Sequence, residues 1–129
     1  MRRTLVLCVV IISATVWVSS SSALARWFHS PSRNIDCEVG LSRPGLGTYA
    51  FCVSKRPVRC AKLKPDGKVL VYQNCLLDGN GADNAFTLRY GHSLRVGPFR
   101  CTSRRIGTQC LVVRNGHGFV IGREGLKRF

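Results

Sequence analysis

Short runs of β-prone residues alternate with turn residues along the chain after residue 25. Residues 49–54 (YAFCVS), 57–63 (PVRCAKL) and 68–73 (KVLVYQ) form three such runs, and the tetrapeptide KPDG at 64–67 separates the last two. Proline presets φ and glycine accepts positive φ, so KPDG predicts a tight turn. Because no long segment of this part follows a helical period, the pattern predicts a meander or a small sandwich of antiparallel strands.

The C-terminal part continues the pattern with shorter runs. Asn115 and Gly116 lie between two apolar runs, and Asn-Gly in this setting strongly favours a β-hairpin. Residues 77–84 (LDGNGADN) predict a loop because Gly, Asn and Asp dominate them. At residues 124–127 a short helical turn is an alternative that no capping residue supports. The predicted strands of this part are residues 85–90, 93–96, 99–103, 109–113 and 119–121.

Two stretches of the chain resemble each other. Residues 28–37 read FHSPSRNIDC, and residues 99–110 read FRCTSRRIGTQC. In the first stretch we expect residues 31–34 to turn and 35–39 to return as a strand. In the second we expect a turn at 104–107, which sets Cys101 opposite Cys110 within reach of a disulfide. The similarity predicts an internal repeat of two hairpins, with Ser30 standing where the second copy has Cys101.

The first 25 residues have the features of a signal peptide. Arg2 and Arg3 precede a largely apolar run over residues 5–18, and Ala23-Leu24-Ala25 supplies a small-residue cleavage signal. The run is shorter than the roughly 20 residues that span a bilayer, although an uncleaved anchor is the alternative. We therefore expect a signal peptide at 1–25, cleavage near Ala25, and a single secreted or extracytoplasmic domain at 26–129.

The cysteines predict a disulfide framework. The chain has seven, and Cys8 lies in the predicted leader. An even number in a short exported domain indicates three disulfides. Six cysteines allow 15 connectivities; besides Cys101–Cys110 we favour Cys37–Cys52, which leaves Cys60 with Cys75. There is no C-x-x-C pair and no histidine at zinc-ligand spacing, so we expect neither a metal nor a cofactor.

The chain is strongly basic, with 20 Lys and Arg, 6 Asp and Glu, and a net charge of +14. Without Arg2 and Arg3 the basic residues number 18, which leaves +12 on the predicted domain. Such a field attracts polyanions, including acidic glycans and anionic envelope polymers. Aromatic side chains are not interleaved with the charges, as they are in proteins that bind single-stranded nucleic acid; Trp27, Phe28 and Phe99 are expected in the core. The arginines most suited to bind an anionic group are those of the C-terminal hairpins, Arg100, Arg104, Arg105, Arg114 and Arg123.

Candidate catalytic groups are few. Glu38, His92 and His117, with arginines nearby, are the one plausible set for acid–base chemistry. Neither a G-x-S-x-G elbow, nor a P-loop, nor an H-E-x-x-H motif is present. The stretch from Asp78 resembles the start of a calcium loop, but Ala82 and Arg89 occupy positions that need ligands. We leave open whether the protein is an enzyme and favour a binding domain; a small secreted basic hydrolase such as a ribonuclease is the alternative.

The chain resembles a family of small exported actinobacterial proteins without an assigned function. The resemblance covers most of residues 26–129 and rests on SPSxNIxC from Ser30, LxYG from Leu88, GPFxCxS from Gly97, GxxC from Gly107 and GHGFxIxR from Gly116. It implies an exported, disulfide-bonded, mainly β domain, lipid-anchored in some relatives. It implies no activity, so a structural or host-facing effector protein is a third interpretation.

This chain departs from the family pattern at one position in the first turn. Relatives often have glycine where this chain has Arg33. If the turn requires positive φ there, arginine adopts that conformation at a cost of about 1–2 kcal/mol. Otherwise the turn type differs in this protein.

Overall fold

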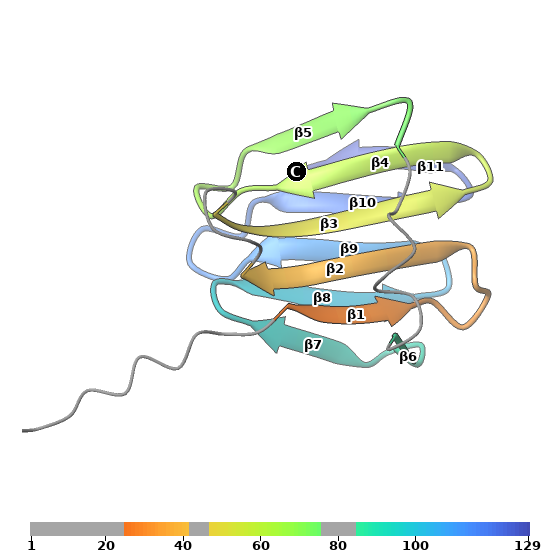
Figure 1. Ribbon diagram of the computed structural model, residues 1–129, viewed down its shortest axis with the longest axis horizontal. Helices are drawn as coiled ribbons and strands as arrows, with labels where there is room; N and C mark the ends of the chain where they lie inside the picture. The colour runs from red at the N-terminus through yellow and green to blue at the C-terminus, as the bar shows by residue number, and fades with distance from the viewer. Residues whose placement is uncertain (1–24, 42–46, 76–84) are drawn as a thin grey trace, which may run out of the picture.

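Every regular element in the described part of the chain is a β-strand. The computed structural model describes residues 25–41, 47–75 and 85–129 (Figure 1). Sheet A contains β1 (Arg26–His29), β2 (Ile35–Leu41), β3 (Thr48–Lys55), β4 (Val58–Leu63), β5 (Val69–Tyr72) and β6 (Phe86–Thr87). Sheet B contains β7 (Ser93–Val96), β8 (Phe99–Arg104), β9 (Gly107–Val112), β10 (Gly118–Gly122) and β11 (Gly125–Arg128). The mainly β, disulfide-stapled fold expected from the sequence is confirmed.

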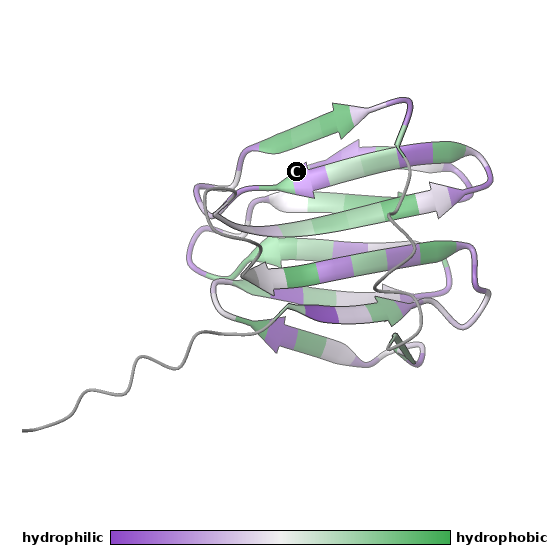
Figure 2. Ribbon diagram, viewed as in Figure 1, coloured by the Kyte–Doolittle hydropathy of each residue, from purple (hydrophilic) through white to green (hydrophobic). Residues whose placement is uncertain are grey.

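The two sheets pack face to face and share one hydrophobic core (Figure 1). Their strand orders are β5-β4-β3-β2-β1-β6 and β11-β10-β9-β8-β7. Successive side chains of a strand point to opposite faces, and hydrophobic and polar positions accordingly alternate along strands such as β2 (Figure 2). Phe28, Phe99 and Phe119 are fully buried in the core, where each contributes about 1.5–3 kcal/mol by burial.

All three expected disulfides are present. Cys37–Cys52 joins directly opposed residues of β2 and β3, and Cys101–Cys110 does the same for β8 and β9. Cys60–Cys75 ties β4 to the segment after β5. The Sγ atoms of Cys52 and Cys110 lie 3.8 Å apart, so one bridge from each sheet meets the other in the core.

The internal repeat exists, but the expected correspondence between hairpins was wrong by one strand. Strands β1–β5 and β7–β11 form two antiparallel meanders, each with a disulfide between its second and third strands. The counterpart of β8–β9 is therefore β2–β3, whereas the similar sequences had matched it with β1–β2. Ser30 lies in a turn, and its match to Cys101 in sequence has no structural equivalent.

Three further expectations need correction. The strand predicted at residues 85–90 is reduced to β6, which pairs with β1 in parallel. Residues 124–127 contain no helical turn, because Gly125–Arg128 is strand β11. Trp27 is half-buried on the outer face of sheet A, while its neighbour Phe28 enters the core. The predicted loop at 77–84 lies outside the described residues.

Four turns gather at one end of the sandwich, on the right in Figure 1. They join β1 to β2, β3 to β4, β8 to β9 and β10 to β11. We call this the basic end. Its four turns hold one acidic residue, Glu124, and the basic residues Arg33, Arg56, Arg105 and Arg123, and the strands before two of these turns end in Lys55 and Arg104. Residues 25–41, 47–75 and 85–129 contain no helix that could span a bilayer.

Candidate functional site

A pocket of about 170 Å³ lies at the basic end. Turns from both sheets line it, and these are the two turns whose sequences resemble each other. Sheet A contributes Ser30, Ser32, Asn34 and Ile35; sheet B contributes residues 104–107 and 122–123, and Tyr90 comes from the loop before β7. The two similar stretches of sequence, 28–37 and 99–110, therefore supply opposite walls of one pocket.

Three guanidinium groups surround this pocket without compensation. Arg104, Arg105 and Arg123 are exposed, and none has a carboxylate within 4.0 Å among the described residues. The Arg105 guanidinium lies over the Tyr90 ring, 5.2 Å from its centroid. This cation–π contact limits the motion of the side chain while leaving its N–H donors available. The pocket thus presents a concentration of hydrogen-bond donors and positive charge.

The serine hydroxyls on the opposite wall hold the first turn in shape. The backbone N–H of Ile35 donates to Ser30 Oγ at 3.1 Å, and Ser30 Oγ lies 3.0 Å from Ser32 Oγ. Ser32 Oγ also accepts from the backbone N–H of Asn34 at 3.3 Å. Because a hydroxyl combines one donor with two acceptor sites, the exposed Ser32 can also bond a ligand.

Asn34 connects this wall to a third turn. Its amide group donates to the carbonyl oxygen of Arg56 at 3.2 Å, and its Oδ1 accepts from the backbone N–H of Arg56 at 3.0 Å. The backbone N–H of Lys55 in turn donates to the carbonyl oxygen of Asn34. The aligned position in the other turn is Arg105, which projects a cation. One turn is fixed to its neighbours, and the other carries the charge.

Two glycines allow the remaining wall to close. A Cβ at Gly107 would collide with the carbonyl oxygen of Ile121, and a Cβ at Gly122 would collide with that of Ile106. The β8–β9 turn therefore packs backbone to backbone against β10. This contact holds Arg104 and Arg105 in a fixed position relative to Arg123.

Behind the pocket the interior becomes polar. Ser103 and Thr108 are directly opposed on β8 and β9, each next in sequence to a residue that lines the pocket. Both are fully buried, and their hydroxyls have no hydrogen-bond partner among the described residues. Ser54 is fully buried as well. One pair of polar residues, Ser103 and Thr108, thus separates the apolar core from the pocket wall.

Comparisons of the chain with protein-family models, curated proteins and solved structures find no match.

The sequence predicted the arginines of this pocket but not its other residues. Tyr90, Ser30, Ser32 and Ile106 were missed as site residues, although all lie in or beside the motifs noted above. The signal that could have found them is the resemblance of the two turns, had both been placed at one end of a sandwich.

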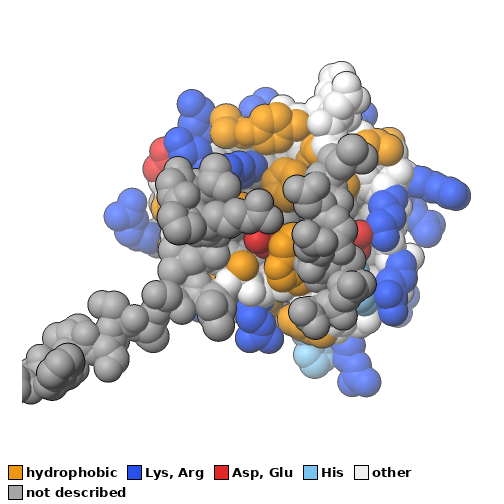
Figure 3. All heavy atoms as spheres, in the orientation of Figure 1, with side chains coloured by type: hydrophobic (Ala, Val, Ile, Leu, Met, Phe, Trp, Pro, Cys, Tyr) orange, Lys and Arg blue, Asp and Glu red, His pale blue; other side chains and the backbone are white. Residues whose placement is uncertain are grey.

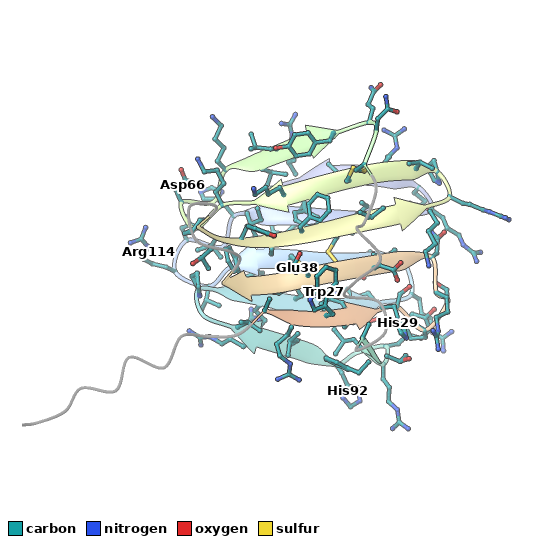
Figure 4. All side chains as sticks on the ribbon, viewed as in Figure 1. Trp27, His29, Glu38, Asp66, His92 and Arg114 are labelled. Carbon is teal, nitrogen blue, oxygen red and sulfur yellow. A yellow bond between two sulfur atoms is a disulfide. The ribbon has the colours of Figure 1, made fainter. Side chains whose placement is uncertain are left out.

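The other two predicted binding arginines lie elsewhere. Arg100 is exposed near the start of β8, the strand next to the edge strand β7 of sheet B. Arg114 lies at the end of the sandwich away from the pocket, in the turn that bonds to the β4–β5 turn through Asn115 and Asp66 (Figure 4). The structure therefore brings three of the five predicted arginines together.

The residues of the catalytic alternative are far apart in the fold. Glu38 lies on the outer face of β2, where its carboxylate accepts from the Tyr49 hydroxyl at 3.2 Å. His92 precedes β7 at the lower edge in Figure 4, and His117 belongs to the β9–β10 turn near Arg114. Each of these three residues therefore lies on a different element and in a different part of the molecule. None of them lines the pocket.

His29 is a buried histidine next to the first turn of the pocket. It ends β1 at the basic end and is 8% exposed. Burial lowers the pKa of His29 below its usual 6.5, and the charge of Arg33 lowers it further, while Asp36 opposes the shift. The imidazole is therefore neutral at physiological pH.

One group of potential metal ligands exists among the described residues, and it consists of disulfide sulfurs. The Sγ atoms of Cys37, Cys52 and Cys110 lie within 4.8 Å of one another. All three are oxidised in the two core bridges. A metal needs thiolates, so this arrangement is a structural contact of the core.

Proposed function

We propose that the protein is an exported, non-enzymatic binding domain that holds an anionic group of an envelope polymer or partner at its basic end. The observation that carries the proposal is the convergence of Arg104, Arg105 and Arg123 on one pocket without carboxylate partners. Guanidinium groups bind phosphate and carboxylate oxygens through paired N–H donors. A hydroxyl-bearing wall opposite them, at Ser32, supplies further polar contacts.

The character of the whole chain supports an extracytoplasmic role. Three disulfides are typical of proteins that fold in an oxidising compartment. The leader at residues 1–25 would deliver the domain there after cleavage near Ala25. Outside the cytoplasm, a net charge of +12 would draw the domain to acidic glycans or phosphate-bearing polymers.

The test compares two triple variants that remove equal charge from opposite ends. Arg104, Arg105 and Arg123 are replaced by alanine in one, and Lys64, Lys68 and Arg114 in the other. Binding of linear polyphosphate and of polygalacturonate is measured by titration calorimetry over a salt series. With about 0.5 kcal/mol per exposed contact, the first variant should bind about tenfold more weakly, and the control should change much less.

Equal losses in the two variants would show that binding follows total charge and would contradict a site at the basic end. The two polymers separate phosphate from carboxylate preference. Incubation with RNA addresses the hydrolase alternative: time-dependent cleavage that a His117→Ala variant loses would replace the binding proposal.

A further inference from the structure

Sheet B carries its positive charge on a face without any acidic residue. Its five strands contain no Asp or Glu. Residues 85–129 include nine Lys and Arg against the single Glu124. The outer face of sheet A is different in kind: it carries Trp27, Phe51 and Tyr72, and hydrophobic atoms show on it in Figure 3, with Lys and Arg around the rim.

Three arginines on the outer face of sheet B form a line toward the pocket. On β8, Arg100, Thr102 and Arg104 alternate with buried residues and so share the outer face. Arg95 on β7 is directly opposite Arg100. Like charges that face each other across two strands destabilise a sheet, and neither arginine has a carboxylate within 4.0 Å among the described residues. An anion between them would remove this repulsion.

The line continues round the end of the molecule. Arg104 is both the last residue of β8 and part of the pocket wall, and Arg105 and Arg123 follow at the basic end. From Arg100 to Arg104 the strand covers about 14 Å, at roughly 3.4 Å per residue. The positive surface thus runs along a flat face and then turns a corner.

We propose that this surface binds a flexible, extended polyanion, which lies along β8 between Arg95/Arg100 and Arg104 and enters the pocket with one of its anionic groups. The inference rests on the proposed function and adds the shape of the ligand: a polymer chain, longer than the pocket. Between the two β8 arginines, the Thr102 hydroxyl lies 2.7 Å from that of Ser93. Because only one of the two donates to the other, one hydroxyl proton of this pair remains for the same chain.

The positive surface covers both the outer face of sheet B and the basic end, and this shape favours a flexible polymer over a membrane or a second copy of the protein. A bilayer surface is flat, so it can contact the outer face of sheet B or the basic end, but not both together. A second copy of the protein carries the same positive face and is repelled by it. A flexible chain can follow both surfaces, and its charge complements them.

Chain length is the variable that tests the proposal. Triphosphate is short enough to occupy the pocket alone, whereas long linear polyphosphate can reach both surfaces. We expect wild type to bind the long chain, per phosphate, at least about tenfold more tightly, because added contacts combine within one ligand. An Arg95→Thr/Arg100→Thr variant should lose most of this gain and keep the affinity for triphosphate. Its salt dependence should be shallower by about 1.4, at ~0.7 per lost contact.

The control is Lys64→Thr/Lys68→Thr, which removes two charges at the opposite end and should keep the full gain. If the Arg95→Thr/Arg100→Thr variant keeps the wild-type gain, the extended track is wrong while the pocket stands. If triphosphate binding does not depend on Arg104, Arg105 and Arg123, the pocket itself fails, whatever the long chain does. Binding to phosphatidylglycerol vesicles without binding to polyphosphate would overturn the polymer in favour of a membrane.

Discussion

The backbone of Arg33 is strained, and the strain comes from the turn and not from any contact of the arginine side chain. Its φ is 60°, and no other non-glycine residue among those described has positive φ. The turn therefore needs the left-handed conformation, which was the first of the two alternatives that the sequence left open. Arg33→Gly should be more stable than Arg33→Ala by about 1 kcal/mol, since both lack the charge and only alanine retains the Cβ.

Urea unfolding of the two variants measures this difference. The hydrogen bonds that residue 33 makes in the turn use its backbone: its N–H donates to the carbonyl oxygen of Ser30, and its carbonyl oxygen accepts from Lys55 Nζ. Both variants therefore keep them. Equal stabilities would mean that the turn relaxes to another conformation when the arginine is removed.

His29 makes stability depend on pH. Its pKa is lowered in the fold, by burial first and by Arg33 next, so the unfolded chain binds its proton more readily. Stability is therefore complete above the unfolded value of about 6.5 and falls as the pH drops from there toward the folded pKa. In urea unfolding between about pH 5 and pH 7, a His29→Gln variant should lose this slope. The exposed His92, changed to Gln, is the control and should keep it.

The turns show what local sequence can and cannot reveal about the elements. Asn115-Gly116 and KPDG were identified correctly, because residue types with special backbone preferences fix such turns. The role of Asn34 was not predictable, since its partner Arg56 is 22 residues away. The pocket likewise depends on two turns brought together by packing of the sheets, and no local pattern contains that information.

The opposed pair Arg95 and Arg100 should lower the stability of the free protein. Replacing Arg95 by threonine removes the repulsion and keeps a residue suited to a strand. We expect a gain of about 0.2–1 kcal/mol in the free energy of unfolding, together with weaker binding of long polyanions. Lys127→Thr is the matched control, because the residue opposite Lys127 is the uncharged Val120; it should show no such gain.

Raised ionic strength provides a second measurement of the same pair. Salt screens exposed charges, so the difference in stability between wild type and Arg95→Thr should shrink at high salt. A gain that persists unchanged would assign the effect to strand propensity.

At the scale of the whole molecule, the sequence predicted the class of fold and its bridges better than its symmetry. Cysteines on neighbouring strands pair because a meander sets them opposite each other. This reasoning predicted Cys101–Cys110 correctly, and the structure shows that it holds for Cys37–Cys52 as well. The correspondence between the two halves of the repeat was wrong because the similar residues in and beside two turns, 32–35 (SRNI) and 103–106 (SRRI), dominated the comparison. The parallel pairing of β6 with β1 joins segments about 60 residues apart along the chain, and no local signal indicates it.

The disulfides allow chain entropy to be separated from packing. Cys37–Cys52 and Cys60–Cys75 each span 15 residues, so the loop-closure model assigns both about 3 kcal/mol. Their surroundings differ: Cys37 and Cys52 are fully buried, and Cys52 Sγ contacts Cys110 Sγ, whereas Cys75 is only half-buried. Replacing Cys37 and Cys52 together by alanine should therefore cost about 1–2 kcal/mol more than replacing Cys60 and Cys75, because it leaves a cavity beside the second core bridge.

Denaturant unfolding of the two double variants, each with its other two bridges intact, gives the comparison directly. Equal losses would indicate that the bridges act through the unfolded chain alone and that the contact between the sheets contributes little. A larger loss for the core pair would show that the two sheets hold each other through these sulfurs. In that case the same variant should also weaken polyanion binding, since the walls of the pocket belong to different sheets and keep their spacing only while the sheets stay packed.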